Sequence, residues 1–195
     1  MNLVFASNNK YKLEEVKSAL GTDFEVVSLS EIGCYDEIPE DHDTLKKNAF
    51  QKARYIYDRY GKDCFADDTG LEITALGGRP GVYSARYAGE HCSFEENMNK
   101  VLAELEGVSD RKAYFLTVIA LILNGKEYVF EGRVSGTILT EKHGTEGFGY
   151  DPIFQPDGYE LSFAQMPIYE KNKISHRGRA LEKLVEFLNK GTSKN

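Results

Sequence analysis

Residues 111–139, "RKAYFLTVIALILNGKEYVFEGRVSGTIL", place two long apolar runs on either side of Asn124-Gly125. Asn-Gly is the strongest short-range signal for a two-residue hairpin turn, because both residues tolerate the positive φ angles that the turn needs. We therefore predict a long antiparallel pair of strands, and with it an elongated sheet.

The segments on either side of this hairpin alternate between strand and helix patterns. Short apolar runs predict strands, and apolar residues at helical spacing predict helices. Ser93 followed by Glu96 predicts a capping box, and Ser175 is a candidate helix N-cap. Strands are expected at residues 2–7, 24–29 and 64–68, and helices at 9–20, 44–61, 93–107 and 175–191. This order predicts an α/β fold, an elongated mixed sheet flanked by helices, in a single domain of residues 1–195.

The composition excludes several classes of partner. The chain has 195 residues and a formal net charge of −7, so general binding to nucleic acid or to an anionic membrane is not expected. A small anionic ligand remains compatible, because a metal ion or a local cluster of cations can reverse the local field. Three widely spaced cysteines form neither a disulfide framework nor a metal pattern. With no long apolar segment and no signal-peptide pattern, we expect a cytoplasmic protein.

Two adjacent carboxylates, Asp67 and Asp68, stand at the expected end of the strand 64–68. A turn is one interpretation, since Asp and Gly favour turns. A magnesium site is the other, since Mg²⁺ takes one or two carboxylates and fills its octahedron with phosphate oxygens and water. One aspartate could also orient or deprotonate a water that attacks phosphorus. Glu40 belongs to the same set, although in the acidic loop 31–43 a solvated role is the better interpretation for Glu40 alone.

The segment "SNNKYK", residues 7–12, lies where a strand is expected to lead into a helix. Its hydroxyl and amide groups, together with the free N–H groups and the positive dipole end of the helix, favour an anion site. Lys12 lies one turn into the helix and could fold back onto a phosphate. On this segment alone, an N-cap followed by a solvated lysine is the more common explanation. Glycines typical of a Walker or Rossmann loop are missing.

Two further segments carry groups that suit a nucleobase. In "GTEGFGYDPIF", residues 144–154, Phe148 and Tyr150 could stack on a base and Asp151 could accept from a base N–H. The same aromatic residues could equally fill the core. In "EKNKISHRGRALEKL", residues 170–184, His176 and Arg177 fall in the first turn of a helix, where cations oppose the dipole. That placement favours a role in ligand binding, which Lys171 could share.

These four segments, in this order, resemble the inosine triphosphate pyrophosphatase family, the HAM1-like enzymes that remove non-standard purine nucleotides. The matching motifs are spread from residue 5 to 188. The resemblance implies an elongated fold of two lobes with a central cleft, and typically a homodimer. It also implies Mg²⁺-dependent cleavage of ITP, dITP and XTP between the α- and β-phosphates, which gives the monophosphate and pyrophosphate and so cleans the nucleotide pool.

The resemblance also implies roles for individual residues. Asp68 would accept the proton of the attacking water and, with Glu40, bind magnesium. The triphosphate would be held by the loop from Ser7 to Lys12, and Thr69 would contact the substrate. The base would be held by residues 148–151, joined by Lys171, His176 and Arg177. The full set of substrate-binding residues is Ser7, Asn8, Asn9, Lys10, Tyr11, Lys12, Thr69, Phe148, Gly149, Tyr150, Asp151, Lys171, His176 and Arg177.

This chain departs from the family pattern at two positions. Asn8 replaces the usual Gly of the phosphate loop, and Lys47 replaces the usual Glu at the start of the second helix. Neither change removes a residue that is assigned to chemistry.

Base selectivity is expected to depend on donors such as the His176 imidazole or the Arg177 guanidinium. These would accept a 6-oxo purine and reject adenine, whose 6-amino group is itself a donor. Three alternatives remain open: a nucleotide-binding module without catalysis, an RNA-binding protein that uses Phe148 and Tyr150, and a pyrophosphatase for another altered nucleotide. The net charge of −7 disfavours the RNA-binding protein.

Overall fold

The computed structural model describes residues 2–20 and 24–192. Within them, seven strands form one sheet of order β2-β1-β3-β5-β6-β7, with β4 paired to β3. The strands are β1 (Asn2–Phe5), β2 (Glu25–Val27), β3 (Cys64–Ile73), β4 (Pro80–Gly81), β5 (Lys112–Leu123), β6 (Lys126–Ile138) and β7 (Phe154–Pro156). The helices are α1 (Lys10–Leu20), α2 (Leu45–Tyr60), α3 (Phe94–Glu104), α4 (Ile168–Ile174) and α5 (His176–Thr192).

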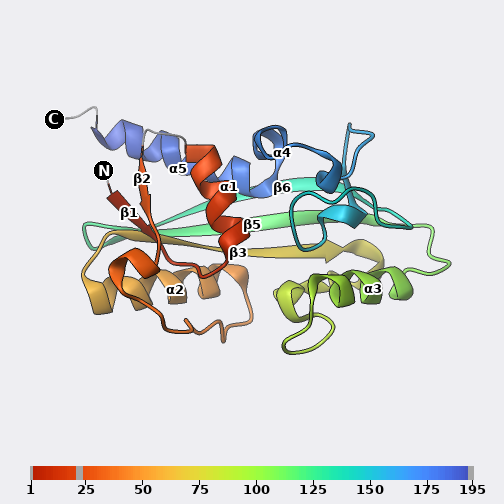
Figure 1. Ribbon diagram of the computed structural model, residues 1–195, viewed down its shortest axis with the longest axis horizontal. Coiled ribbons are helices and arrows are strands. Elements are labelled where there is room, and N and C mark those ends of the chain that lie inside the picture. Colours follow the sequence, from red (N-terminus) through yellow and green to blue (C-terminus); the bar gives the residue numbers. More distant parts are fainter. Residues whose placement is uncertain (1, 21–23, 193–195) are drawn as a thin grey trace.

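The predicted hairpin determines the length of the molecule. β5 and β6 pair without interruption from Lys112↔Thr137 to Leu123↔Lys126, and Asn124 and Gly125 turn the chain with φ angles of 51° and 73°. Figure 1 shows β3, β5 and β6 running along the long axis, with α2 and α3 on one side and α1, α4 and α5 on the other. The prediction of an α/β fold with an elongated mixed sheet is confirmed.

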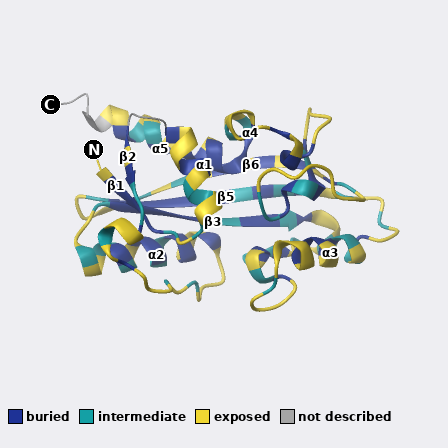
Figure 2. Ribbon diagram, viewed as in Figure 1, coloured by how far each residue is buried: buried dark blue, intermediate teal, exposed yellow. Residues whose placement is uncertain are grey.

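Alternating side chains of the central strands build two cores, one on each face of the sheet. Phe65, Ile119 and Leu121 pack with α1 and α5 on one face. Cys64, Ala66 and their neighbours on β5 pack with α2 on the other face. This alternation with a period of two is what a strand covered on both sides requires. Figure 2 shows these strands as a buried layer between helices whose outer faces are exposed.

A second lobe continues the long strands beyond these two cores. Leu71 and Ile73 of β3 pack there with α3 and with the aromatic side chains Phe115, Phe154 and Phe163. We refer to the part built on β1, β2, α1, α2 and α5 as the first lobe, and to the part around α3, β4 and β7 as the second lobe. The two lobes share β3, β5 and β6.

A gap in the sheet separates the two lobes. On one edge of β3, β1 pairs with Cys64 and Phe65, and β4 pairs with Leu71 and Glu72. Between these contacts, residues 66–70 of β3 have no strand beside them on that edge within the described residues. An unpaired edge with strands on both sides of it leaves room for a ligand next to Asp67 and Asp68.

One prediction about this strand is wrong, because β3 does not end at the two aspartates. It continues to Ile73, paired with β5 from Cys64↔Ile122 to Ile73↔Ala113. Pairing along the whole strand outweighs the local turn preference of Asp and Gly. Asp67 and Asp68 are therefore internal residues of a strand, and their side chains leave it on opposite faces of the sheet.

Two glycines bring the C-terminal helices close to the sheet and to each other. A Cβ on Gly132 of β6 would lie 2.0 Å from the carbonyl oxygen of His176, and a Cβ on Gly178 would lie 1.7 Å from that of Asn172. Neither distance is compatible with a side chain, so the first turn of α5 can lie against β6 and α4 only because both residues are glycine. The sequence patterns did not predict α4. Within residues 2–20 and 24–192, no helix is long and apolar enough to span a membrane.

Candidate active site

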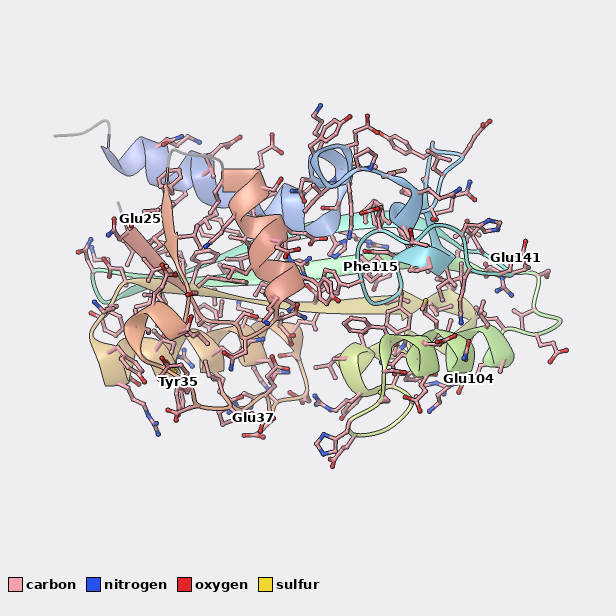
Figure 3. The ribbon with its side chains drawn as sticks, in the orientation of Figure 1. Glu25, Tyr35, Glu37, Glu104, Phe115 and Glu141 are labelled. Carbon is pink, nitrogen blue, oxygen red and sulfur yellow. The ribbon has the colours of Figure 1, made fainter. Side chains whose placement is uncertain are left out.

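A cleft of about 1050 Å³ lies at the gap in the sheet. Its walls come from the β1–α1 junction, the acidic loop, the free edge of β3, residues 82–97 and the C-terminal segments. Glu37 on the acidic loop and Phe115 on β5 both line it and are both labelled in Figure 3. Of the predicted site residues, only Lys10 and Tyr11 lie outside the lining, which contains Ser7, Asn8, Asn9, Lys12, Glu40, Asp68, Thr69, Phe148, Gly149, Tyr150, Asp151, Lys171, His176 and Arg177.

Asp68 faces α2. Its carboxylate accepts a hydrogen bond from Asn48 Nδ2 at 3.2 Å, and Lys52 Nζ lies 3.7 Å away. The same Lys52 ammonium donates to Glu40 on the acidic loop. Burial raises the pKa of Asp68, and the cations nearby do not fully offset this effect. Two carboxylates thus converge on one cation at the floor of the cleft.

Burial and the surrounding charges also shift the pKa of both partners of Asp68. Burial alone would lower the pKa of Lys52, but Asp68 and Glu40 outweigh it and raise that pKa. Burial alone would raise the pKa of Glu40, but Lys52 outweighs it and lowers that pKa. The carboxylates of Glu40 and Asp68 supply hard oxygen atoms beside the Lys52 ammonium, at a position where positive charge is already stabilised. They fit the partial ligand set that Mg²⁺ takes from a protein.

Asp67 faces α1 and α5 instead. Its carboxylate accepts from Lys12 Nζ at 3.1 Å, Arg177 Nε at 3.0 Å and Thr69 Oγ1 at 3.3 Å. Burial alone would raise its pKa, but Lys12 and Arg177 overcome this and hold the pKa well below the usual range. Asp67 is therefore a fully ionised partner of two cations inside the protein.

A chain of buried ion pairs continues from Arg177 to the other end of the cleft. Glu15 of α1 accepts from Arg177 and, at 2.6 Å, from Lys171 of α4, and Lys171 also donates to Asp151. Asp151 in turn accepts from the backbone N–H of Phe148 at 2.9 Å. Lys171 and Arg177, predicted as substrate-binding residues, line the cleft, and both are paired with carboxylates and almost completely buried, at 3% and 1% exposure.

The aromatic residues divide into a buried one and an exposed group. Of the two interpretations of Phe148 and Tyr150, filling the core holds for Tyr150, which is buried and donates to the carbonyl oxygen of Ser84 at 2.8 Å. Phe148 is half-buried and stacks on Tyr11, with ring centroids 5.4 Å apart, and its ring lies tilted against that of Phe94 of α3, with centroids 5.9 Å apart. These three rings connect the two lobes at the edge of the cleft.

His176 is the one site residue with an unused polar atom in a buried position. Its ring stacks on Phe115 with centroids 4.5 Å apart, and its Nδ1 atom has no hydrogen-bond partner among the described residues. Burial, with Arg177 and Lys171 nearby, lowers its pKa well below the ordinary value. The imidazole is therefore neutral, and the expected conflict between a charged His176 and the helix dipole does not arise.

In the loop 7–12, the polar side chains bond to the backbone of α1, to Asp67 and to the acidic loop. Asn9 caps α1, since its side chain accepts from the backbone N–H of Lys12 at 3.1 Å, and Ser7 Oγ accepts from the N–H of Asn9. The idea of a solvated Lys12 is wrong, because the side chain is only 14% exposed and reaches Asp67. Burial lowers its pKa. Asn8 donates to the backbone oxygen of Asp36 in the acidic loop.

Known proteins match the sequence and the fold over almost the full chain. The sequence model of the Ham1 family matches residues 3–187. The chain belongs to the Ham1 family. It is 52% identical over 188 residues to the dITP/XTP pyrophosphatase of Flavobacterium johnsoniae, covering 96% of this chain and 98% of the relative. It is 54% identical over 190 residues to that of Christiangramia forsetii, covering 97% of this chain and 100% of the relative.

A solved structure of a Ham1 protein agrees with the arrangement of the two lobes. The Staphylococcus aureus Ham1 protein superposes with a TM-score of 0.87 at 40% identity, covering 98% of this chain and 100% of that chain. The resemblance predicted from the four motifs is confirmed.

Several residues at the site of this Ham1-family chain were not predicted. Asn48 and Lys52 lie in the same buried stripe of α2 as Leu45, Ala49 and Ala53. Polar residues inside an apolar helical stripe are a signal that could have identified both of them. Glu15 and Phe94 offer no such signal, because only the fold brings them to the cleft.

Proposed function

We propose that this chain is a hydrolase that cleaves dITP, ITP and XTP between the α- and β-phosphates, releasing the nucleoside monophosphate and pyrophosphate. The names of its relatives support the substrate class. The observation that carries the chemistry is the pair of carboxylates, Glu40 and Asp68, that converge on Lys52 at the floor of the cleft. The biological role would be removal of non-standard purine nucleotides from the nucleotide pool of the cytoplasm.

Each part of the cleft would act on a different part of the substrate. Asp68 would orient a water molecule and accept its proton while the water oxygen bonds to the α-phosphorus and the bond to the bridging oxygen breaks. Lys12 and Lys52 would neutralise phosphate oxygens, and the N-terminus of α1 would add backbone donors. The half-buried ring of Phe148 would stack on the base.

Glu40 and Asp68 would also hold a magnesium ion. Among the described residues no third carboxylate or histidine completes a metal cluster, so phosphate oxygens and water would supply the remaining ligands. Bound there, magnesium would polarise the phosphate oxygens and neutralise charge that develops on them.

His176 is a better candidate than Arg177 for reading the 6-position of the base. Each of the three Arg177 nitrogens already donates, to Asp67, Glu15 and Thr69. The neutral imidazole has one N–H donor and an unpartnered Nδ1. A donor at this point would favour the 6-oxo group of hypoxanthine and xanthine over the 6-amino group of adenine.

Product analysis tests this proposal. Wild-type protein, with and without Mg²⁺, is offered dITP, ITP, XTP, dGTP and dATP, and products are separated by ion-exchange chromatography. Asp68→Asn is compared with Asp58→Asn, a matched change on the exposed part of α2 outside the cleft. Hydrolysis in ¹⁸O-labelled water should place the label in the monophosphate.

The expected result is pyrophosphate and monophosphate from dITP, ITP and XTP, little from dATP, loss in Asp68→Asn and full activity in Asp58→Asn. Release of a diphosphate and inorganic phosphate would contradict the position of the cleavage. Tight binding of dITP without turnover would favour a nucleotide-binding module instead. Analytical ultracentrifugation of the same samples tests the homodimer that the family implies.

A further inference from the structure

Five lysine and arginine side chains line the cleft, and four of them are already paired with carboxylates. Lys12 pairs with Asp67, Lys52 with Glu40 and Asp68, Lys171 with Glu15 and Asp151, and Arg177 with Asp67 and Glu15. The fifth is Arg86. Among the described residues it has no carboxylate partner, and its guanidinium lies over the ring of Tyr83, 5.3 Å from the ring centroid.

The segment that carries Arg86 is fixed at several points. Ser84 Oγ accepts from the backbone N–H of Leu71 at 2.8 Å and donates to the carbonyl oxygen of Gly81 at 2.6 Å. The carbonyl oxygen of Ser84 accepts from Tyr150, and that of Ala85 accepts from Asn97 of α3. Arg86 therefore belongs to a segment of the second lobe that several hydrogen bonds hold in place. Ser84 connects this segment to Leu71, next to the free edge of β3.

The paired cations of the cleft leave no excess positive charge to neutralise a bound triphosphate. Five carboxylates (Glu15, Glu40, Asp67, Asp68 and Asp151) face the four paired cations, so this group is not positive by itself. A bound triphosphate adds several negative charges, and cleavage places more charge on the leaving pyrophosphate. A cation that no carboxylate already neutralises is best placed to stabilise that charge.

We propose that Arg86 binds the outer phosphates of the substrate, which leave as pyrophosphate. This proposal rests on the proposed function. A guanidinium binds phosphate through two parallel N–H···O bonds, and the ring of Tyr83 supports its plane. Asp68 is buried and Arg86 is half-exposed. If the α-phosphate reacts beside Asp68, as the proposed function requires, Arg86 would meet the phosphates that lie nearer the surface. With Lys12 and Lys52 on the first lobe, the triphosphate would link the two lobes.

Binding measurements separate this role from a general effect on the fold. Arg86→Gln, Arg86→Lys and the control Arg79→Gln are titrated calorimetrically with inorganic tripolyphosphate and with IMP, at constant Mg²⁺ and salt. Arg79 lies seven positions earlier on the same connection but does not line the cleft, so its change removes the same charge without removing a cleft residue.

Arg86→Gln should bind tripolyphosphate at least about tenfold more weakly, bind IMP within about twofold of wild type, and raise KM for ITP by at least about tenfold. The affinity of Arg86→Lys for tripolyphosphate should lie between those of wild type and Arg86→Gln, because an ammonium keeps the charge without the bidentate geometry. Arg79→Gln should match wild type in all three measurements. Circular dichroism checks that each variant is folded, and Arg86→Lys keeps the test available if Arg86→Gln does not fold.

Unchanged tripolyphosphate affinity in the Arg86 variants would overturn the proposal. So would an equal loss for IMP and tripolyphosphate, since it would place Arg86 near the base or the α-phosphate. These outcomes differ from failure of the proposed function. If wild-type protein does not hydrolyse ITP, the function is wrong; if wild type hydrolyses it and Arg86→Gln does so with the same KM, only the assignment of Arg86 is wrong.

Discussion

Asp67 and Asp68 are neighbours on β3, but their side chains lie in two different regions of the molecule. Asp67 is enclosed between α1 and α5 and accepts three hydrogen bonds, two of them from cations, and its pKa is lowered. Asp68 lies between α2 and the cleft, accepts from the Asn48 amide and the backbone N–H of Thr69, and has only a more distant ammonium beside it, and burial raises its pKa. The same residue type thus has opposite shifts of pKa at adjacent positions.

This difference shows how a strand can carry adjacent carboxylates without strong repulsion. Successive side chains of a strand point to opposite faces, so each aspartate meets its own set of cations. A buried charge costs several kcal/mol in lost hydration unless partners replace the water. Hydrogen bonds from fixed partners replace the hydration of the Asp67 carboxylate, which suits a role in stabilising the fold. Asp68 has free carboxylate capacity and faces the cleft, where a water molecule or metal ion can use it.

The largest effect should come from Asp68→Asn. Losing the proton acceptor should lower kcat about a thousandfold, the middle of the range for general-base catalysis. Because Lys52 keeps Glu40 as its partner and asparagine retains an oxygen that can accept a hydrogen bond, the free energy of unfolding should change by less than about 1 kcal/mol. Steady-state kinetics with dITP and urea unfolding measure the two quantities. A large loss of stability would mean that Asp68 is structural after all.

Asp67→Asn should show the reverse pattern. The change leaves Lys12 and Arg177 buried without their shared counter-charge, and breaking a buried ion pair costs about 3 kcal/mol or more. Urea unfolding measures this loss, with Asp58→Asn as the surface control. An unfolding free energy equal to that of wild type would contradict a structural role for Asp67, whatever happens to activity.

The sequence predicted the local features correctly and the distant contacts poorly. The turn at Asn124-Gly125 and the capping box of Ser93 and Glu96 depend on a few consecutive residues, and both are present. Ser175 also caps α5 as expected, accepting from the N–H of Gly178. The end of β3 was misplaced because pairing with β5, not the local sequence, decides it. The family resemblance located most of the cleft residues, which composition and periodicity alone could not do.

The ion pairs of the cleft could not be inferred from the sequence, since their partners are far apart in the chain. Lys171 bonds to Glu15 across 156 positions and Arg177 to Asp67 across 110. A lysine or arginine near a motif therefore suggested a ligand contact, when its main partner is a carboxylate of the protein. Of the lysines and arginines that line the cleft in the described part of the chain, only Arg86 has no such partner, and only the folded structure shows this difference.

A smaller effect is expected from pH, through His176 on the Asp67 side of the sheet. Burial opposes its protonation most strongly, Arg177, Lys171 and Lys12 oppose it further and Asp67 favours it, so that the pKa is well below the ordinary value of 6.5. Below pH 6.5 the unfolded chain gains a proton at this residue that the folded protein does not, so stability falls as the pH falls. The slope is at most about 1.4 kcal/mol per pH unit.

Comparing the pH dependence of unfolding for wild type and His176→Asn isolates this contribution. Between pH 7.5 and 5, wild type should lose more stability than the variant, even if the variant is less stable overall. A variant with the same slope as wild type would show that the pKa of His176 is not lowered in the folded protein.

The smallest effect should come from Asn8→Gly, at a second pair of identical neighbours. Asn8 and Asn9 adjoin the N-terminus of α1, where phosphate binding is proposed, yet Asn9 caps the helix while Asn8 bonds to the acidic loop from an exposed position. Removing one exposed hydrogen bond should change stability by less than about 1 kcal/mol and KM for dITP by less than about threefold. Asn9→Ala, which removes a cap, should cost about 1 kcal/mol and serves as the comparison. A tenfold rise in KM for Asn8→Gly would mean that the Asn8 amide leaves Asp36 and binds the triphosphate. Asn8 and Asn9 would then have a common role at this end of α1, whereas the roles of Asp67 and Asp68 differ.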